Sequence, residues 1–93
     1  MDIGKAKQAA KEGHLIARKG WNGKGMFLFY VPGSKITVTE GRPLARALPV
    51  GTEIEYLPHL DMKTADGKVV PWLASQTDLL SEDYYYVPRD ERA

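Results

Sequence analysis

Hydrophobic and polar positions repeat with a helical period at the start of this chain and with a period of two afterwards. Ala6 and Ala10 are spaced to share one face of a helix, with Asp2 placed as its N-cap and Gly13 just past its end. The pattern predicts an amphipathic helix over residues 3–12. Because its buried stripe is mostly alanine, we expect this helix to pack closely against a sheet.

From residue 14 onwards the alternation is typical of half-buried strands. The turn signal Pro32-Gly33 is expected to bring residues 35–39 back antiparallel to residues 26–31. The pair Asp66-Gly67 is the strongest hairpin signal in the chain. The expected strands are residues 14–19, 26–31, 35–39, 53–57, 59–64, 68–70 and 84–87.

Two further stretches complete the predicted architecture. Residues 40–51 contain two prolines and two glycines and predict an irregular connection. Ser75 and Asp78 form a capping-box pattern that opens a helix of one or two turns. We therefore expect one α+β domain over residues 1–93, a small mostly antiparallel sheet with an N-terminal and a short C-terminal helix. Its tail, about residues 88–93, should be exposed.

Composition excludes several classes of protein. Hydrophobic residues make up 43% and charged residues 27%, which is the balance of a globular domain. The absence of cysteine excludes a disulfide framework and a zinc–thiolate site, and it suits the cytoplasm. A net charge of +1 does not indicate general electrostatic binding to DNA or RNA polymers or to a membrane surface. Neither a membrane-spanning run nor a signal peptide is evident.

The size of the chain favours self-association. For a mass of 10.4 kDa, apolar burial contributes about 140 kcal/mol and ordering the chain costs about 140 kcal/mol. Because the two terms cancel, a lone protomer is marginal and a homo-oligomer is expected.

The first candidate site is the glycine-rich segment after the first predicted strand. Its glycines let the backbone approach an anion closely, Lys24 adds a cation, and Trp21 offers a face for stacking a purine. The alternative is an ordinary loop whose tryptophan fills the edge of the core. The segment matches neither the phosphate-loop nor the dinucleotide motif. Its residues are Trp21, Asn22, Gly23, Lys24, Gly25 and Met26.

The second candidate site surrounds the start of the predicted C-terminal helix. A tryptophan precedes a helix N-terminus that favours an anion, and the polar side chains there suit ribose hydroxyls or a base edge. The alternative is that the polar residues only cap the helix while the tryptophan packs in the core. The residues are Trp72, Ser75, Gln76, Thr77 and Asp78.

A third segment offers acid–base chemistry. His59 and Asp61 share one face of a predicted strand, the minimum for a base and its orienting carboxylate. No obvious nucleophile accompanies them, and two such residues do not make a metal site. A polar solvent or interface face is the alternative. The run Tyr84-Tyr85-Tyr86 is more typical of an edge strand or protomer contact than of a stacking platform.

Together these segments resemble one protein family, the phage Thoeris anti-defence proteins of the second type. The resemblance rests on ARKGWNGKGMFLFYVPGS (residues 17–34), on PHLDMKTADGKVVPWLASQTDLLSED (residues 58–83) and on the alanine-rich leading helix. Residues 35–57 carry little of it. The chain departs from the family at its tyrosine run, where a tryptophan is expected after the aspartate.

The resemblance implies a non-enzymatic sponge. Members of that family bind the cyclic ADP-ribose signal made by the TIR-domain enzyme of bacterial Thoeris defence and hold it intact, so that the effector is never activated. It also implies homotetramers with ligand sites between protomers, no cofactor, and in some members a separate site for the cyclic dinucleotides of CBASS defence. The expected ligand is a cyclic ADP-ribose isomer of the gcADPR type, met in the cytoplasm of the infected host.

Two other function classes stay open at this point. An enzyme that degrades the cyclic nucleotide signal would use His59 and Asp61 as acid and base. A protein–protein adaptor would use the aromatic strands. The sponge predicts recovery of intact signal after the protein is denatured, the enzyme predicts a new product, and the adaptor predicts no thermal shift with any small molecule.

Overall fold

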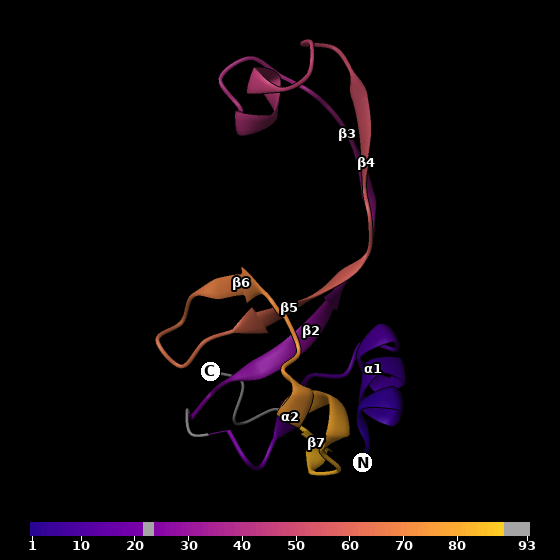
Figure 1. Ribbon diagram of the computed structural model, residues 1–93, viewed down its shortest axis with the longest axis vertical. Coiled ribbons are helices and arrows are strands. Elements are labelled where there is room, and N and C mark those ends of the chain that lie inside the picture. Colours follow the sequence, from indigo (N-terminus) through magenta and orange to yellow (C-terminus); the bar gives the residue numbers. More distant parts are fainter. Residues whose placement is uncertain (22–23, 89–93) are drawn as a thin grey trace.

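The computed structural model describes residues 1–21 and 24–88. Its strands form an antiparallel five-stranded sheet in the order β6-β5-β2-β1-β7 and a separate antiparallel pair, β3-β4 (Figure 1). The expected α+β class, with one helix at the N-terminus and a short one near the C-terminus, is confirmed. The elements are α1 (Ile3–Lys11), β1 (Ile16–Arg18), β2 (Phe27–Val31), β3 (Ser34–Thr37), η1 (Pro43–Arg46), β4 (Glu53–Tyr56), β5 (His59–Lys63), β6 (Val69–Pro71), α2 (Gln76–Leu80) and β7 (Tyr84–Tyr86).

Helix α1 begins at the predicted residue and ends at Lys11, one residue before the predicted end. The Asp2 carboxylate accepts a hydrogen bond from the Lys5 amide at 2.9 Å, which satisfies a free donor of the first turn. Gly13 takes a positive φ of 102° just past the C-cap, where a side chain would be strained. The alanine stripe lies against the sheet and is buried. Its residues are Ala6, Ala9 and Ala10.

Hairpin prediction succeeds at one turn and fails at another. Asp66-Gly67 joins β5 to β6 as expected, with Gly67 at a φ of 86°. The expected pairing of residues 35–39 with residues 26–31 is wrong: β3 pairs with β4, and β2 pairs with β1 and β5. Both hydrogen-bonding edges of β2 are therefore taken.

Pro32-Gly33 is not a tight turn, because the chain runs on past it into β3. Gly33 has no positive φ, and its need for glycine is steric. A Cβ atom there would lie 2.8 Å from the Tyr56 carbonyl oxygen of the returning strand. The reversal occurs instead in the predicted irregular connection, which holds the 3-10 turn η1.

The β3-β4 pair and this connection form an arm (residues 34–56) that projects from the rest of the protein (Figure 1). The molecule measures 45 × 26 × 24 Å. Its Cα radius of gyration is 15.9 Å, against about 12 Å for a compact domain of this length. The arm makes the protomer elongated.

Each face of the five-stranded sheet carries its own apolar cluster. Ile16 and Tyr84 pack with the alanines of α1 on one face. On the other, Ala17, Phe27 and Val87 form a second cluster with Trp21 at its border. Within the described ranges, no helix has both the length and the apolar character that a membrane crossing requires. The two clusters hold in place the strand ends that carry the candidate site.

Candidate functional site

An ion-pair network joins the end of β1 to α2 and to the start of β7. The Arg18 guanidinium donates from Nη1 to Asp78 Oδ1 at 2.6 Å and from Nε to Asp83 Oδ1 at 2.9 Å. The side chains of Arg18 and Asp78 are only 10% and 11% exposed. Asp83 Oδ2 also accepts from the Gly20 amide at 2.9 Å. The network therefore fixes where the chain turns from β1 towards Trp21.

Asp78 is the centre of this network. Besides Arg18, its Oδ1 accepts from the Trp21 indole Nε1 at 3.2 Å, and its Oδ2 accepts from the Ser75 amide at 2.9 Å. Its backbone carbonyl accepts from the Tyr84 hydroxyl at 2.7 Å. One buried carboxylate thus ties the first candidate segment to the second.

The two tryptophans meet directly. Trp21 and Trp72 lie with ring centroids 6.4 Å apart and ring planes at 67°, an edge-to-face contact. Both residues are half-buried. The structure brings together the tryptophans of the two segments, which are far apart in the sequence.

The electrostatics of the cluster keep its carboxylates ionised. Burial alone would raise the pKa of Asp78, but hydrogen bonds from Ser75, Arg18 and Trp21 outweigh it and hold this pKa below the usual value. The Arg18 hydrogen bond likewise lowers the pKa of Asp83. Burial and the nearby Asp78 charge raise the pKa of the Tyr84 phenol, so Tyr84 stays a hydrogen-bond donor.

The glycine-rich segment is only partly described. Asn22 and Gly23 lie outside the described residues. Lys24 is exposed, and Gly25 and Met26 are half-buried. The Gly25 carbonyl accepts a hydrogen bond from Lys63 Nζ at 2.9 Å, which attaches this segment to β5. Gly25 has a φ of 74°, a conformation that favours glycine.

The polar residues of the second segment divide into two groups. Ser75 and Asp78 form the predicted capping box, in which the Asp78 amide donates to Ser75 Oγ at 3.0 Å. These two residues therefore have a structural role at the start of α2. Gln76 and Thr77 are exposed beside them. Their side chains are the donors and acceptors that this segment presents at the surface.

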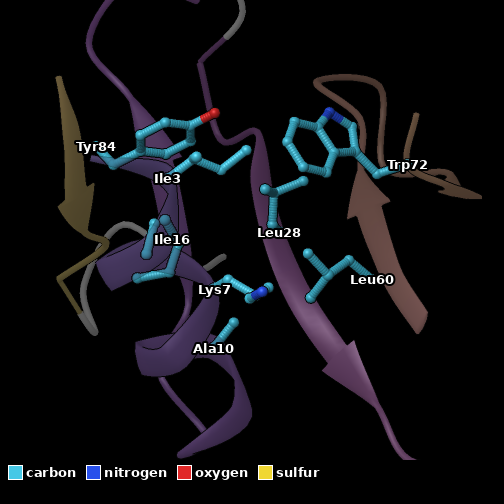
Figure 2. Close-up of a pocket in the computed structure, with 9 residues that line it drawn as sticks. Ile3, Lys7, Ala10, Ile16, Leu28, Leu60, Trp72 and Tyr84 are labelled. Carbon is cyan, nitrogen blue, oxygen red and sulfur yellow. The ribbon is translucent and has the colours of Figure 1, made fainter. Parts of the chain in front are cut away.

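A cavity of about 120 Å³ lies between α1 and the sheet, next to this cluster (Figure 2). Trp72 forms one wall, and Leu28 and Leu60 of neighbouring strands form the wall beside it. The amino group of Lys7 lies at its border. An apolar cavity of about 150 Å³ holds a benzene-sized group. This one has the size for one ring or one apolar side chain.

Comparisons with known proteins identify the family of this chain. A family model described as Tad2-like, the Thoeris anti-defense 2-like domain, matches residues 1–87. The chain is 37% identical over 86 residues to "Thoeris anti-defense 2" of Bacillus phage SP01, covering 90% of this chain and 91% of that protein. The chain belongs to the Thoeris anti-defense 2-like family. The expected resemblance is confirmed.

In this Thoeris anti-defense 2-like domain, the acid–base pair flanks Leu60 on β5, and the Leu60 carbonyl accepts a hydrogen bond from the Trp72 amide at 2.9 Å. His59 Nε2 is 3.2 Å from Asp61 Oδ1, and Nδ1 is 3.1 Å from the Leu57 carbonyl oxygen. Both nitrogens thus face acceptors of the protein itself. Leu60, between them on β5, lines the cavity, so His59 and Asp61 point to the other face of the sheet.

Sequence reasoning missed two members of the domain's buried network, Arg18 and Asp83. A signal was present: Arg18 lies two residues after Ile16 and so shares the face of β1 that α1 covers. A buried guanidinium requires carboxylate partners. The pattern therefore demands acidic residues near Arg18, although it does not say which ones.

Proposed function

We propose that this protein is a phage anti-defence protein that binds and sequesters, without cleaving, a cyclic ADP-ribose signal of bacterial Thoeris defence. Membership of the Thoeris anti-defense 2-like family carries the proposal. The protein acts in the cytoplasm of the infected host, where that signal is made. Binding the signal keeps it from the effector and so prevents its activation.

The joined segments offer a group for each part of a cyclic ADP-ribose isomer. An exposed part of Trp21 or Trp72 stacks the purine, and Lys24 with the Gly25 backbone faces the pyrophosphate. Gln76 and Thr77 read the ribose hydroxyls. Asn22, Gly23 and Met26 complete the proposed set of site residues.

Asp78 serves this site in two ways. A carboxylate has about four acceptor positions, and protein donors from Arg18, Trp21 and Ser75 take three of them. Among the described residues no donor takes the fourth, which is the position proposed for a ligand hydroxyl. Because the same carboxylate fixes the Trp21 ring in place, little ordering is needed when a base stacks on it, which favours tight binding.

The proposal includes a homo-oligomer, most simply a tetramer, with signal sites shared between protomers. The elongated shape supports association. A cyclic dinucleotide of the CBASS type is the second proposed ligand. No cofactor takes part, because holding a signal intact requires no chemistry.

Recovery of the signal tests the mechanism. The protein and a gcADPR-type isomer are incubated together, with the isomer in slight molar excess. The mixture is then heated to denature the protein, and the signal in the supernatant is analysed by chromatography. We expect depletion of free signal before heating and full recovery of the intact molecule after it. A new product would overturn sequestration in favour of an enzyme that degrades the signal. The matched variant His59→Ala then decides whether the His59–Asp61 pair is responsible, because it removes the base without touching the tryptophans.

A further inference from the structure

Lys63, at the end of β5, is held against the glycine-rich segment by two contacts. Its Nζ donates a hydrogen bond to the Gly25 carbonyl at 2.9 Å and lies 5.3 Å from the centroid of the Phe27 ring. A cation over an aromatic face is attracted by the electron density of the ring. The residue is half-buried. Its ammonium group is therefore fixed in position before any ligand binds.

The Lys63 ammonium keeps donors for a further partner. A lysine ammonium has three N–H donors, and the Gly25 carbonyl takes one of them. Within residues 1–21 and 24–88, no ion pair joins Lys63 to a carboxylate. Asp61, on the same face of β5, instead has its buried Oδ1 3.2 Å from His59 Nε2. A half-buried cation without an anionic partner in the protein suits an anionic ligand.

Lys63 faces the same side of the sheet as the apolar cluster that holds Trp21. In the register of β2 and β5, Lys63 lies opposite Phe27, so the two side chains share a face. Phe27 belongs to the cluster against which Trp21 packs. Only β2 lies between β5 and β1, the strand that leads to Trp21, and two strand spacings amount to about 10 Å. A ligand with two riboses and a pyrophosphate can therefore contact both Trp21 and Lys63.

The charges at the two ends of this segment differ in sign. At the α2 end, the Arg18 guanidinium faces the carboxylates of Asp78 and Asp83, so one positive and two negative charges give a net charge of −1. At the β5 end, Lys24 and Lys63 are both basic. An anion is repelled by the first arrangement and attracted by the second. The pyrophosphate of a bound signal should therefore lie towards β5.

We propose that Lys63 binds the pyrophosphate of the signal, together with Lys24, and so sets the direction in which the signal lies across the site. The purine and the riboses then lie at the tryptophans and α2, where carboxylates accept hydrogen bonds from hydroxyls. This inference rests on the proposed function, because it names a further residue for the same ligand. Sequence reasoning did not indicate Lys63, because its place beside Gly25 arises from the pairing of β5 with β2.

Three substitutions of Lys63 separate its charge from its hydrogen bond to Gly25. Lys63→Met removes both, Lys63→Gln keeps a donor for the carbonyl without the charge, and Lys63→Arg keeps both. The measurement is calorimetric titration with a gcADPR-type isomer. We expect the Kd to rise about 10- to 100-fold in Lys63→Met and Lys63→Gln, because a charge-assisted hydrogen bond is lost. Lys63→Arg should stay within about fivefold of the wild type.

Lys68→Met is the matched control. It removes the same charge from the neighbouring hairpin, where the Lys68 side chain is 82% exposed and lies 3.6 Å from Asp66. Its affinity should stay within about twofold of the wild type. Salt gives a second readout, because it screens a contact between charges. Between about 50 and 500 mM NaCl, the affinity of Lys63→Met should therefore fall less than that of the wild type.

The outcomes separate this inference from the proposed function. Wild-type affinity in Lys63→Gln would show that Lys63 only fixes the glycine-rich segment, and this would overturn its pyrophosphate role. An unchanged salt dependence in Lys63→Met, or equal losses in Lys63→Met and Lys68→Met, would overturn it as well. A wild-type protein that does not bind the isomer would overturn the proposed function itself. Thermal melting checks that each variant is folded, and if Lys63→Met is not, Lys63→Gln and Lys63→Arg carry the comparison, including that of salt dependence.

Discussion

Arg18 holds two carboxylates together at a point where three elements meet, and its loss should be the costliest substitution near the site. Replacing it with methionine keeps most of the volume but leaves the Asp78 charge buried without its partner. We expect Arg18→Met to lower the free energy of unfolding by about 3 kcal/mol, measured by urea denaturation. The neighbouring Lys19 is exposed, so Lys19→Met should stay within about 0.5 kcal/mol of the wild type. Equal effects of the two changes would show that the network is not a structural anchor.

Trp21 combines a stacking face with a hydrogen-bond donor, and two substitutions separate these roles. Stacking of a base on an aromatic ring contributes about 1–3 kcal/mol, so Trp21→Ala should weaken binding of the gcADPR-type signal about 5- to 150-fold. Trp21→Phe keeps a ring but removes the Nε1 donor to Asp78. It should retain most of the affinity while lowering the melting temperature.

Calorimetry and thermal melting of the same preparations decide between the two roles of Trp21. If the ring only fills the edge of the core, both variants lose stability and the folded fraction binds normally. A folded Trp21→Ala protein with unchanged affinity would remove Trp21 from the proposed site.

At the scale of elements, the carboxylates that tie α2 and β7 to β1 make stability depend on pH. Asp78 and Asp83 both have a pKa below the ordinary value in the folded chain. The unfolded chain therefore binds more protons near pH 4, and stability rises with pH there. The contribution is fully present above about pH 4 and is lost as the pH falls through the folded values.

The Asp83→Asn variant tests this assignment by urea unfolding between neutral and acidic pH. Because asparagine does not titrate, the variant should be less stable at neutral pH and should lose less stability on acidification. A pH profile parallel to that of the wild type would mean that Asp83 does not contribute to the acid response.

The helices and strands also show which parts of the fold can be predicted from the sequence and which cannot. The capping box of Ser75 and Asp78 and the Asp66-Gly67 hairpin are local patterns, because each is formed by residues close together in the sequence. Both are confirmed. The partner of residues 35–39 depends instead on which strands already occupy the edges of β2, and no local pattern contains that information.

The candidate site divides in the same way. The residue types of Trp21 and Trp72 indicate stacking, yet their contact at 6.4 Å depends on long-range folding that brings β1 beside β7 and α2 beside Arg18. A buried arginine on β1 predicts acidic partners in general. Its actual partners, Asp78 and Asp83, lie 60 and 65 residues away along the chain.

At the scale of the whole molecule, the cavity and the Trp21–Trp72 pair share Trp72, whereas the arm projects from the rest of the protomer. The proposed signal site at Trp21 and Trp72 and the projecting arm are therefore separate parts of the protomer. One thermodynamic measurement decides whether the proposed cyclic dinucleotide competes with the proposed cyclic ADP-ribose isomer for one site or binds at another.

A ligand at 100 times its dissociation constant stabilises the folded state by about 2.7 kcal/mol. Two ligands that compete for one site, each at this concentration, give together only about 3.1 kcal/mol, whereas two independent sites give about 5.4 kcal/mol. We expect the larger value when a gcADPR-type isomer and a cyclic dinucleotide are present together. The measurement is urea unfolding with each ligand alone and with both, and Trp21→Ala should reduce the contribution of the first ligand only. A combined stabilisation near the smaller value would assign both ligands to the tryptophan cluster, and a null result with the dinucleotide alone would remove it as a ligand.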